Sequence, residues 1–210
     1  MLHASNQQTD TESIWLTIFK DQPEVHVHQF TKLFTESDQA LFVYVITDGA
    51  VIELKGDHSH DGHLVSLCKR GDVFGIRVNS TLDATHSVRA MTLTQTTLRV
   101  MSREHFMQLV MQSPDLFIAL SVCLSKRQHF AQSLQDSCSG SSLRAHVEYI
   151  LSAVATMYGM DHDLASVAVP EDVLVEMVGC PLPLLETYLQ RLVMDGTISV
   201  DMEGVRLRAV

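Results

Sequence analysis

Residues 171–196 read EDVLVEMVGC PLPLLETYLQ RLVMDG, and they contain two helical patterns separated by a sharp break. In both patterns apolar residues recur at steps of three and four, which is the spacing of one buried helix face. Gly179 ends the first pattern, and Pro183 disfavours a helical conformation at the residue before it and starts the second. Two short strand-like runs, 197–200 and 205–208, then flank a turn. Helix, tight turn, helix and hairpin together predict a winged helix-turn-helix.

A long helical pattern lies upstream, from Pro114 to residue 134, and a small polar linker at 135–142 separates it from the next unit. Its apolar residues form one continuous stripe over about five turns. Such a stripe either packs on the preceding domain or forms a coiled-coil seam between two copies of the chain. Its length, with a second domain following, favours the seam and therefore a homodimer. The residues predicted in this seam are Leu120, Leu124, Arg127, Ala131 and Leu134.

Between residues 25 and 101 the chain changes to short runs rich in Val, Ile, Thr, Phe and Leu, interrupted by Gly and Asp. Asp48-Gly49 between two such runs is a hairpin signal, because the turn needs a positive φ. Many short strands without intervening helices predict a small antiparallel β-barrel or sandwich. Short helices are predicted before it, at 13–20, and after it, at 102–112. The predicted strands are 25–30, 40–47, 50–54, 64–68, 87–92 and 97–101.

The composition is that of an acidic globular protein. The 210 residues are 46% hydrophobic and carry a formal net charge of −10, which is not typical of a nucleic-acid binder. No run approaches the ~18 consecutive apolar residues expected of a transmembrane helix, and the N-terminus has no signal-peptide pattern. The four cysteines are scattered without a CxxC pair, which indicates free thiols in a reducing cytoplasm. We therefore expect a cytoplasmic protein with no membrane segment and no cofactor.

These patterns predict an α+β chain in three parts: a β-barrel sensor domain at 1–112, a dimerisation helix at 113–136 and a winged helix-turn-helix domain at 137–210. This order resembles the cyclic-AMP receptor protein/FNR (CRP/FNR) superfamily of bacterial transcriptional regulators. By that resemblance the barrel is expected to be like a cyclic nucleotide-binding domain. The stretches that carry the resemblance are 48–52 (DGAVI), 71–75 (GDVFG) and 171–192.

The resemblance implies an effector pocket between two barrel strands, at Gly75, Ile76, Ala84 and Thr85. In the family a Glu just after the glycine turn holds the ribose, and an Arg-Ser pair holds the phosphate. Here Ile76 stands at the Glu position and Ala84-Thr85 at the Arg-Ser position, so neither charged hydrogen bond can form. The sequence therefore predicts an effector other than a cyclic nucleotide. Iron–sulfur sensing as in FNR needs clustered N-terminal cysteines, whereas the first cysteine here is Cys68.

The resemblance also implies DNA contacts by the second helix of the helix-turn-helix, at Leu182, Pro183 and Thr187, with Arg191 and Arg206 nearby. The first three residues cannot make the bidentate contact that Arg makes to guanine. The last 70 residues include four basic and ten acidic residues, a net charge of −6, which opposes contacts to phosphates. DNA binding is therefore expected only in a divergent form.

The leading hypothesis is a cytoplasmic homodimeric transcriptional regulator rather than an enzyme. Its expected partner is DNA, and RNA polymerase or another protein is a further candidate. A second hypothesis is a relative that has lost sequence-specific DNA binding and acts through protein contacts of its acidic output domain. A third is a cupin-like metalloenzyme in which His26 and His28, two residues apart on one strand, ligate a metal. Because no nucleophile–base pair or paired carboxylates support catalysis, we assign no catalytic or metal-ligating residue.

Overall fold

The computed structural model describes residues 14–56, 62–76, 85–139, 143–157, 168–196, 198–201 and 204–207; for 138–139 and 206–207 it describes the backbone alone. The chain divides into two compact units, which we describe separately. The N-terminal unit comprises Met1–Glu53 and Cys68–His129, and the C-terminal unit comprises Leu54–Leu67 and Phe130–Val210. The domain boundaries at 112 and 136 stay a prediction.

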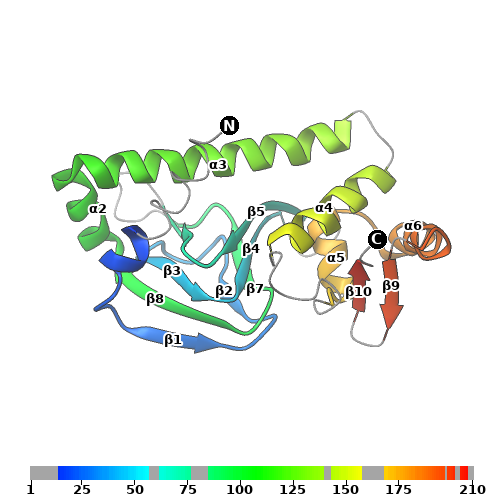
Figure 1. Cartoon of the computed structure of the whole chain (residues 1–210), viewed down its shortest axis with the longest axis horizontal. Coiled ribbons are helices and arrows are strands. Elements are labelled where there is room, and N and C mark those ends of the chain that lie inside the picture. The colour runs from blue at the N-terminus through cyan, green and yellow to red at the C-terminus, as the bar shows by residue number, and fades with distance from the viewer. Residues whose placement is uncertain are drawn as a thin grey trace. The chain divides into compact units, whose positions relative to one another are not determined.

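In the described part of the chain, eight strands form two four-stranded sheets, which confirms the predicted antiparallel strand domain (Figure 1). The barrel is not closed, because strand spacing indicates many short strands but not whether the outermost strands pair. The first sheet has the order β1 (Glu24–Val27), β8 (Thr96–Ser102), β3 (Phe42–Asp48), β6 (Val73–Phe74). The second has the order β2 (Lys32–Phe34), β7 (Arg89–Thr92), β4 (Ala50–Lys55), β5 (His63–Lys69).

The turn at Asp48-Gly49 leads from one sheet to the other. Gly49 has the expected positive φ, at 84°, and a Cβ atom there would lie 2.4 Å from the carbonyl oxygen of Gln95. The strands on either side, β3 and β4, belong to different sheets and do not pair with each other. The turn was therefore predicted correctly, whereas the hairpin was wrong.

The core of the N-terminal unit follows from the alternation of side chains along β3. Ile46 packs in a cluster that draws residues from strands of both sheets, including Phe34 of β2 and Leu98 of β8. Val43 and Val45 point to the other side, because successive side chains of a strand alternate between its faces. There they pack in a second cluster, which we call the outer cluster: Trp15, Phe19, Val43, Val45, Val73, Met101, Phe106, Val110, Leu116, Ala119 and Leu120.

Two helices, together with the helical turn at residues 14–18, supply the other half of the outer cluster. The first is α2 (Arg103–Gln112), and its N-terminus is capped by Ser102, whose hydroxyl accepts a hydrogen bond from the His105 amide at 3.3 Å. The second is α3 (Pro114–Ser139), the long 26-residue helix labelled in Figure 1. The sequence predicted both helices and the break at Pro114, and the structure confirms them.

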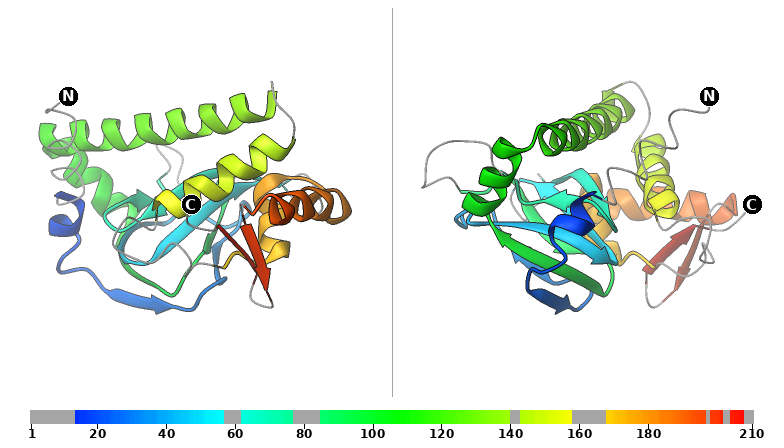
Figure 2. Two further views of the ribbon diagram at one scale, coloured as in Figure 1. Left: turned by 45° about the vertical axis from the view of Figure 1, so that its right-hand side comes forward. Right: turned by 60° about the vertical axis from the view of Figure 1, so that its left-hand side comes forward.

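The C-terminal unit contains the predicted helix-turn-helix with its wing (Figure 2). It consists of α4 (Leu143–Met157), α5 (Glu171–Val178), α6 (Leu182–Met194), β9 (Ile198–Asp201) and β10 (Gly204–Leu207). Gly179 ends α5 in the left-handed region, with φ 71°, which explains the glycine at this turn. Strands β9 and β10 pair antiparallel, and Val169 forms a further bridge to Val205.

Within the described part of the chain, no single helix has the length and apolar composition needed to cross a membrane. Helices α2 and α3 have the required length and apolar composition only when they are counted together, and this pair is bent by 116° at Ser113.

Candidate functional site

The effector position predicted from the sequence lies at the end of β6. Gly75 has φ +76°, and a Cβ atom there would lie 3.0 Å from Cδ2 of Tyr44, so the turn needs glycine. The next residue, Ile76, packs against the outer cluster. Thr85 forms an antiparallel bridge to Gln39, and Ala84 lies outside the described residues. Ile76 thus contributes to the apolar core of its unit, and its side chain has no atom that could accept a hydrogen bond from a ribose.

A buried ion pair connects helix α3 to the strands of the N-terminal unit. Nη1 of Arg127, on α3, lies 3.1 Å from Oε2 of Glu53 on β4. Nη2 donates to the carbonyl oxygen of Val73 at 2.6 Å and lies 3.3 Å from Sγ of Cys68. Only 5% of the Glu53 side chain and 20% of the Arg127 side chain are exposed. One guanidinium therefore joins α3 to strands β4, β5 and β6.

The electrostatics of this pair keep Arg127 charged. Burial is the largest single effect and lowers the pKa of Arg127, but the Glu53 carboxylate together with Cys68, Cys123 and Asp72 raises it by more, so the net shift is upward. Burial also raises the pKa of the Cys123 thiol, one turn before Arg127, so this thiol is neutral at physiological pH. The pair is a structural cross-link in which the charge of Arg127 is matched by a partner from the same chain.

The structure changes the residues of the predicted dimer seam. Leu120 belongs to the outer cluster and Arg127 binds Glu53, so both face the chain's own sheet and are not available to a second copy. Leu134 is buried as well, Ala131 is half-buried, and Leu124 is 38% exposed. Of the predicted stripe, Leu120, Arg127 and Leu134 face inward, whereas Leu124 is exposed.

The outward face of α3 is also apolar, and of its residues only Leu124 was predicted in the seam. Phe117 and Ile118 are 62% and 60% exposed, and Val122 and Leu124, which flank them around the helix, are 37% and 38% exposed. Exposed aromatic and branched residues in a contiguous row are unusual on a monomer surface. The signal in the sequence is that Phe117, Ile118 and Val122 follow Leu116 or Leu120 by one or two positions, which places apolar residues on a second helix face.

The residues of α6 predicted to contact DNA are exposed, but Leu182, Pro183 and Thr187 carry no charge. Leu182 and Pro183 lie in the first turn, and Thr187 donates its hydroxyl to the carbonyl oxygen of Pro183 at 3.0 Å. Arg191 lies over the ring of Tyr188, with its guanidinium carbon 5.6 Å from the ring centroid. The side chain of Arg206 lies outside the described residues. Arg191 is the only Lys or Arg from residue 171 to 194.

The other arginine of the C-terminal unit whose side chain is described, Arg144, is held by carboxylates. Nε of Arg144 lies 2.9 Å from Glu148, and its Nη2 lies 2.8 Å from Asp195. Both hydrogen-bonded carboxylates raise its pKa and neutralise its charge locally. Arg144 therefore fastens α4 to the end of α6, whereas Arg191 is the described cation of α6 that faces solvent.

The histidines proposed as metal ligands are exposed at the edge of the first sheet. His26 on β1 has Nδ1 3.1 Å from Oγ1 of Thr97, and His28 follows the end of the strand. Among the residues that the structure describes, no group of three or more His, Cys, Asp or Glu side chains is arranged to hold a metal ion. The geometry gives the metalloenzyme hypothesis no support.

Comparison with known proteins gives two kinds of match. Residues 24–113 match the family model of the cyclic nucleotide-binding domain. A search of curated protein sequences finds no match to the chain. Among solved structures, the c-di-GMP responsive global regulator CLP of Xanthomonas campestris superposes with a TM-score of 0.77 at 20% identity, covering 96% of this chain and 100% of CLP.

Two further solved structures show the same fold. FixK2 of Bradyrhizobium japonicum has a TM-score of 0.69 at 16% identity and covers 90% of this chain and 93% of its own. A CRP-family transcriptional regulator of Thermus thermophilus has a TM-score of 0.69 at 14% identity, with 87% and 91% covered. At these identities the likeness concerns the fold, from the strands of the N-terminal unit to the wing.

Proposed function

We propose, from the CRP/FNR regulator fold of this chain and its cyclic nucleotide-binding domain at residues 24–113, that it is a cytoplasmic homodimeric transcriptional regulator. It senses an effector other than a cyclic nucleotide and binds DNA through a divergent winged helix. The observation that carries the proposal is coverage: the global regulator CLP matches over 100% of its solved chain and 96% of this one. Such coverage supports the retention of both a sensor part and an output part.

The proposed dimer uses the outward face of α3. Phe117, Ile118, Val122 and Leu124 form the apolar row, and burying them against a second copy removes it from water. Replacing Ile118 and Leu124 by Asp would place unpaired charges in that seam, and we expect light scattering to show a monomer. The matched control is Val25→Asp, an exposed strand residue away from α3. A wild-type protein that is monomeric at tens of micromolar would show that the seam is wrong.

Regulation of transcription is tested by genome-wide crosslinking of the tagged protein. Sharp peaks that disappear in Arg191→Ala but persist in Lys20→Ala, a matched exposed cation of the N-terminal unit, support the proposal. We expect a shallow salt dependence of binding, with a log–log slope of about −2 to −4 per dimer, because few cations face the DNA. A nanomolar affinity for random duplexes, or a slope of about −8 as for highly cationic proteins, would contradict this form of binding.

One specific observation favours a second candidate function. The net charge of −6 over the last 70 residues, with Leu184 and Met194 exposed on α6, suits contacts to a protein better than contacts to phosphates. In this candidate the chain regulates through protein partners, RNA polymerase included. The crosslinking experiment separates the two, because a relative that has lost DNA reading gives no discrete peaks while remaining a stable dimer.

A further inference from the structure

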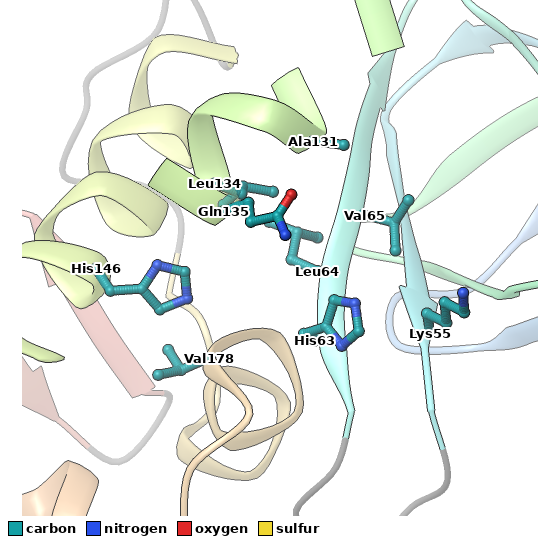
Figure 3. Close-up of a pocket in the computed structure, with 9 residues that line it drawn as sticks. All are labelled: Lys55, His63, Leu64, Val65, Ala131, Leu134, Gln135, His146 and Val178. Atoms are coloured by element: carbon teal, nitrogen blue, oxygen red, sulfur yellow. The ribbon is translucent and has the colours of Figure 1, made fainter. Parts of the chain in front are cut away.

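The C-terminal unit contains a cavity of about 340 Å³ that neither the sequence analysis nor the proposed function assigns. Small-molecule sites in proteins typically measure about 300 to 1,000 Å³ and combine an apolar wall with a few polar groups. Figure 3 shows the imidazole of His146 extending from α4 toward the strands that carry His63 and Lys55. The cavity is lined by Lys55, His63, Leu64, Val65, Ala131, Leu134, Gln135, His146 and Val178.

The polar groups of this cavity are all basic or neutral. Lys55 and His63 come from β4 and β5, His146 comes from α4, and Gln135 adds an amide from α3. None of the nine described lining residues is acidic, in a chain whose formal net charge is −10. The positive charge of Lys55, the N–H donors of two imidazoles and the lack of a carboxylate among the described lining residues favour an anion. The apolar remainder, such as Leu134 and Val178, prefers a hydrocarbon body.

The imidazole of His146 is buried and is held by a polar contact. The residue is 4% exposed, and its Nδ1 lies 2.7 Å from the hydroxyl oxygen of Ser137. This contact sets the orientation of the ring and directs its other edge to the cavity. Burial and the nearby His63 lower the pKa of His146, so protonation is unfavourable until an opposite charge enters.

We propose that this cavity binds a small organic anion, with a carboxylate or phosphate head held between His63 and His146 and an apolar body held by the leucine and valine wall. Lys55, which lies beyond His63 as seen from His146 (Figure 3), adds a positive charge at this side of the cavity. The inference supplies an effector class for the regulator proposed above and so rests on that function for its biological meaning. The binding site itself does not depend on DNA. The site joins β5 to α4 and α5, the first helix of the helix-turn-helix, within one compact unit.

The test is calorimetry on the full-length protein with octanoate, octyl phosphate and octanol, which share a body and differ in the head group. We expect saturable binding of at least one anion that is about tenfold or more tighter than binding of octanol, as for one charged hydrogen bond. Lys55→Met and His146→Gln should each weaken the anion by about tenfold and leave octanol unchanged. Lys20→Met, an exposed lysine of the N-terminal unit, is the matched control and should bind as wild type.

A second measurement uses the wild-type protein and so does not depend on whether His146→Gln perturbs the fold. In the wild-type protein, the bound anion should raise the pKa of His146, followed by its ring signals in NMR, because a negative charge stabilises the imidazolium. Equal affinity for octanol and both anions, or an unchanged titration of His146 in the saturated protein, would overturn the inference. Anion binding by a protein that gives no crosslinking peaks would keep the site and refute DNA binding instead.

Discussion

Two sets of basic side chains, one in each unit, have opposite surroundings. In the N-terminal unit, Arg127 is buried and matched by Glu53, by a carbonyl oxygen and by a thiol, all from the same chain. In the C-terminal unit, Lys55, His63 and His146 surround an open cavity that contains no lining carboxylate among its described residues. The difference teaches that a basic group indicates an anion site only where no carboxylate of the chain shares its surroundings. By this criterion Arg127 is already matched within the N-terminal unit, and the basic cavity lies in the C-terminal unit.

The largest expected effect comes from breaking the buried ion pair between Glu53 and Arg127. Glu53→Gln would leave the Arg127 guanidinium buried without its carboxylate, and we expect a loss of about 3–5 kcal/mol in the free energy of unfolding. Glu24→Gln is the matched control, since Glu24 pairs with Arg99 at 3.2 Å at the surface and such pairs are worth about 0–1 kcal/mol. Urea denaturation measures both.

The double variant Glu53→Leu with Arg127→Met sharpens the same comparison. Replacing a buried ion pair by apolar residues of similar volume is often neutral or stabilising, so this protein should be much closer to wild type than Glu53→Gln. If Glu53→Gln lost less than about 1 kcal/mol, as a surface pair would, the pair would not be the cross-link described here.

A second prediction concerns ligands of the N-terminal unit. Cyclic AMP and cyclic GMP should give no calorimetric heat at ordinary concentrations, because Ile76 packs into the outer cluster and Ala84-Thr85 cannot form the charged contact to phosphate. Loss of a charged partner weakens binding by about 2–5 kcal/mol, or roughly 30- to 4,000-fold. A micromolar dissociation constant for either nucleotide would show that the predicted positions are displaced along the chain.

Local signals in the sequence predicted most of the elements correctly. The break at Pro114, the left-handed turn at Gly179 and the turn at Asp48-Gly49 each depend on neighbours in the chain. Strand β2 and the two-residue β6 were missed because their existence depends on pairing with β7 and β3, far away in sequence. The hairpin at Gly49 was mispredicted for the same reason, because β3 and β4 pair with other strands.

The sites were harder to predict than the elements, because they join residues that are distant in the sequence. Periodicity found the inward face of α3 but could not tell it from a dimer seam, since Phe117 and Ile118 make the opposite face apolar too. Nothing near Arg127 indicates that Glu53, 74 positions earlier, is its partner. His146 has the spacing of a core residue, and only the fold brings it to a cavity with Lys55 and His63.

The third prediction concerns the close approach of Gly179 to Gly62, next to two residues that line the cavity. A Cβ atom on Gly179 would lie 2.5 Å from the carbonyl oxygen of Gly62, next to His63 and Val178, which line the cavity. Gly179→Ala therefore adds a backbone clash to the usual cost of a positive φ, which is about 1–3 kcal/mol for a non-glycine residue. Gly196→Ala is the control, because that glycine has φ +75° and nothing within 4 Å. We expect thermal unfolding to show a larger loss for Gly179→Ala, and equal losses would mean that the two segments are not in contact.

The smallest expected effect is the pH dependence that His146 gives to stability. Its pKa in the folded protein is lowered from the ordinary value of 6.5, first by burial and then by His63. The unfolded chain therefore binds more protons than the folded one below pH 6.5, and stability falls as the pH falls from there toward the folded pKa. Above that window the stabilisation is fully present. One proton limits the slope to about 1.4 kcal/mol per pH unit.

Urea unfolding between about pH 7.5 and about pH 5 measures this slope in wild type and in His146→Gln. The variant should lose stability less steeply on acidification, because its side chain does not titrate. Saturating octanoate should also flatten the wild-type slope, since an anion beside the ring raises the folded pKa toward the unfolded value. Equal slopes for wild type and variant would show that His146 is protonated equally in both states. His146 would then not support the proposed anion site, and only the contrasting half of the comparison, Arg127 matched by Glu53, would stand.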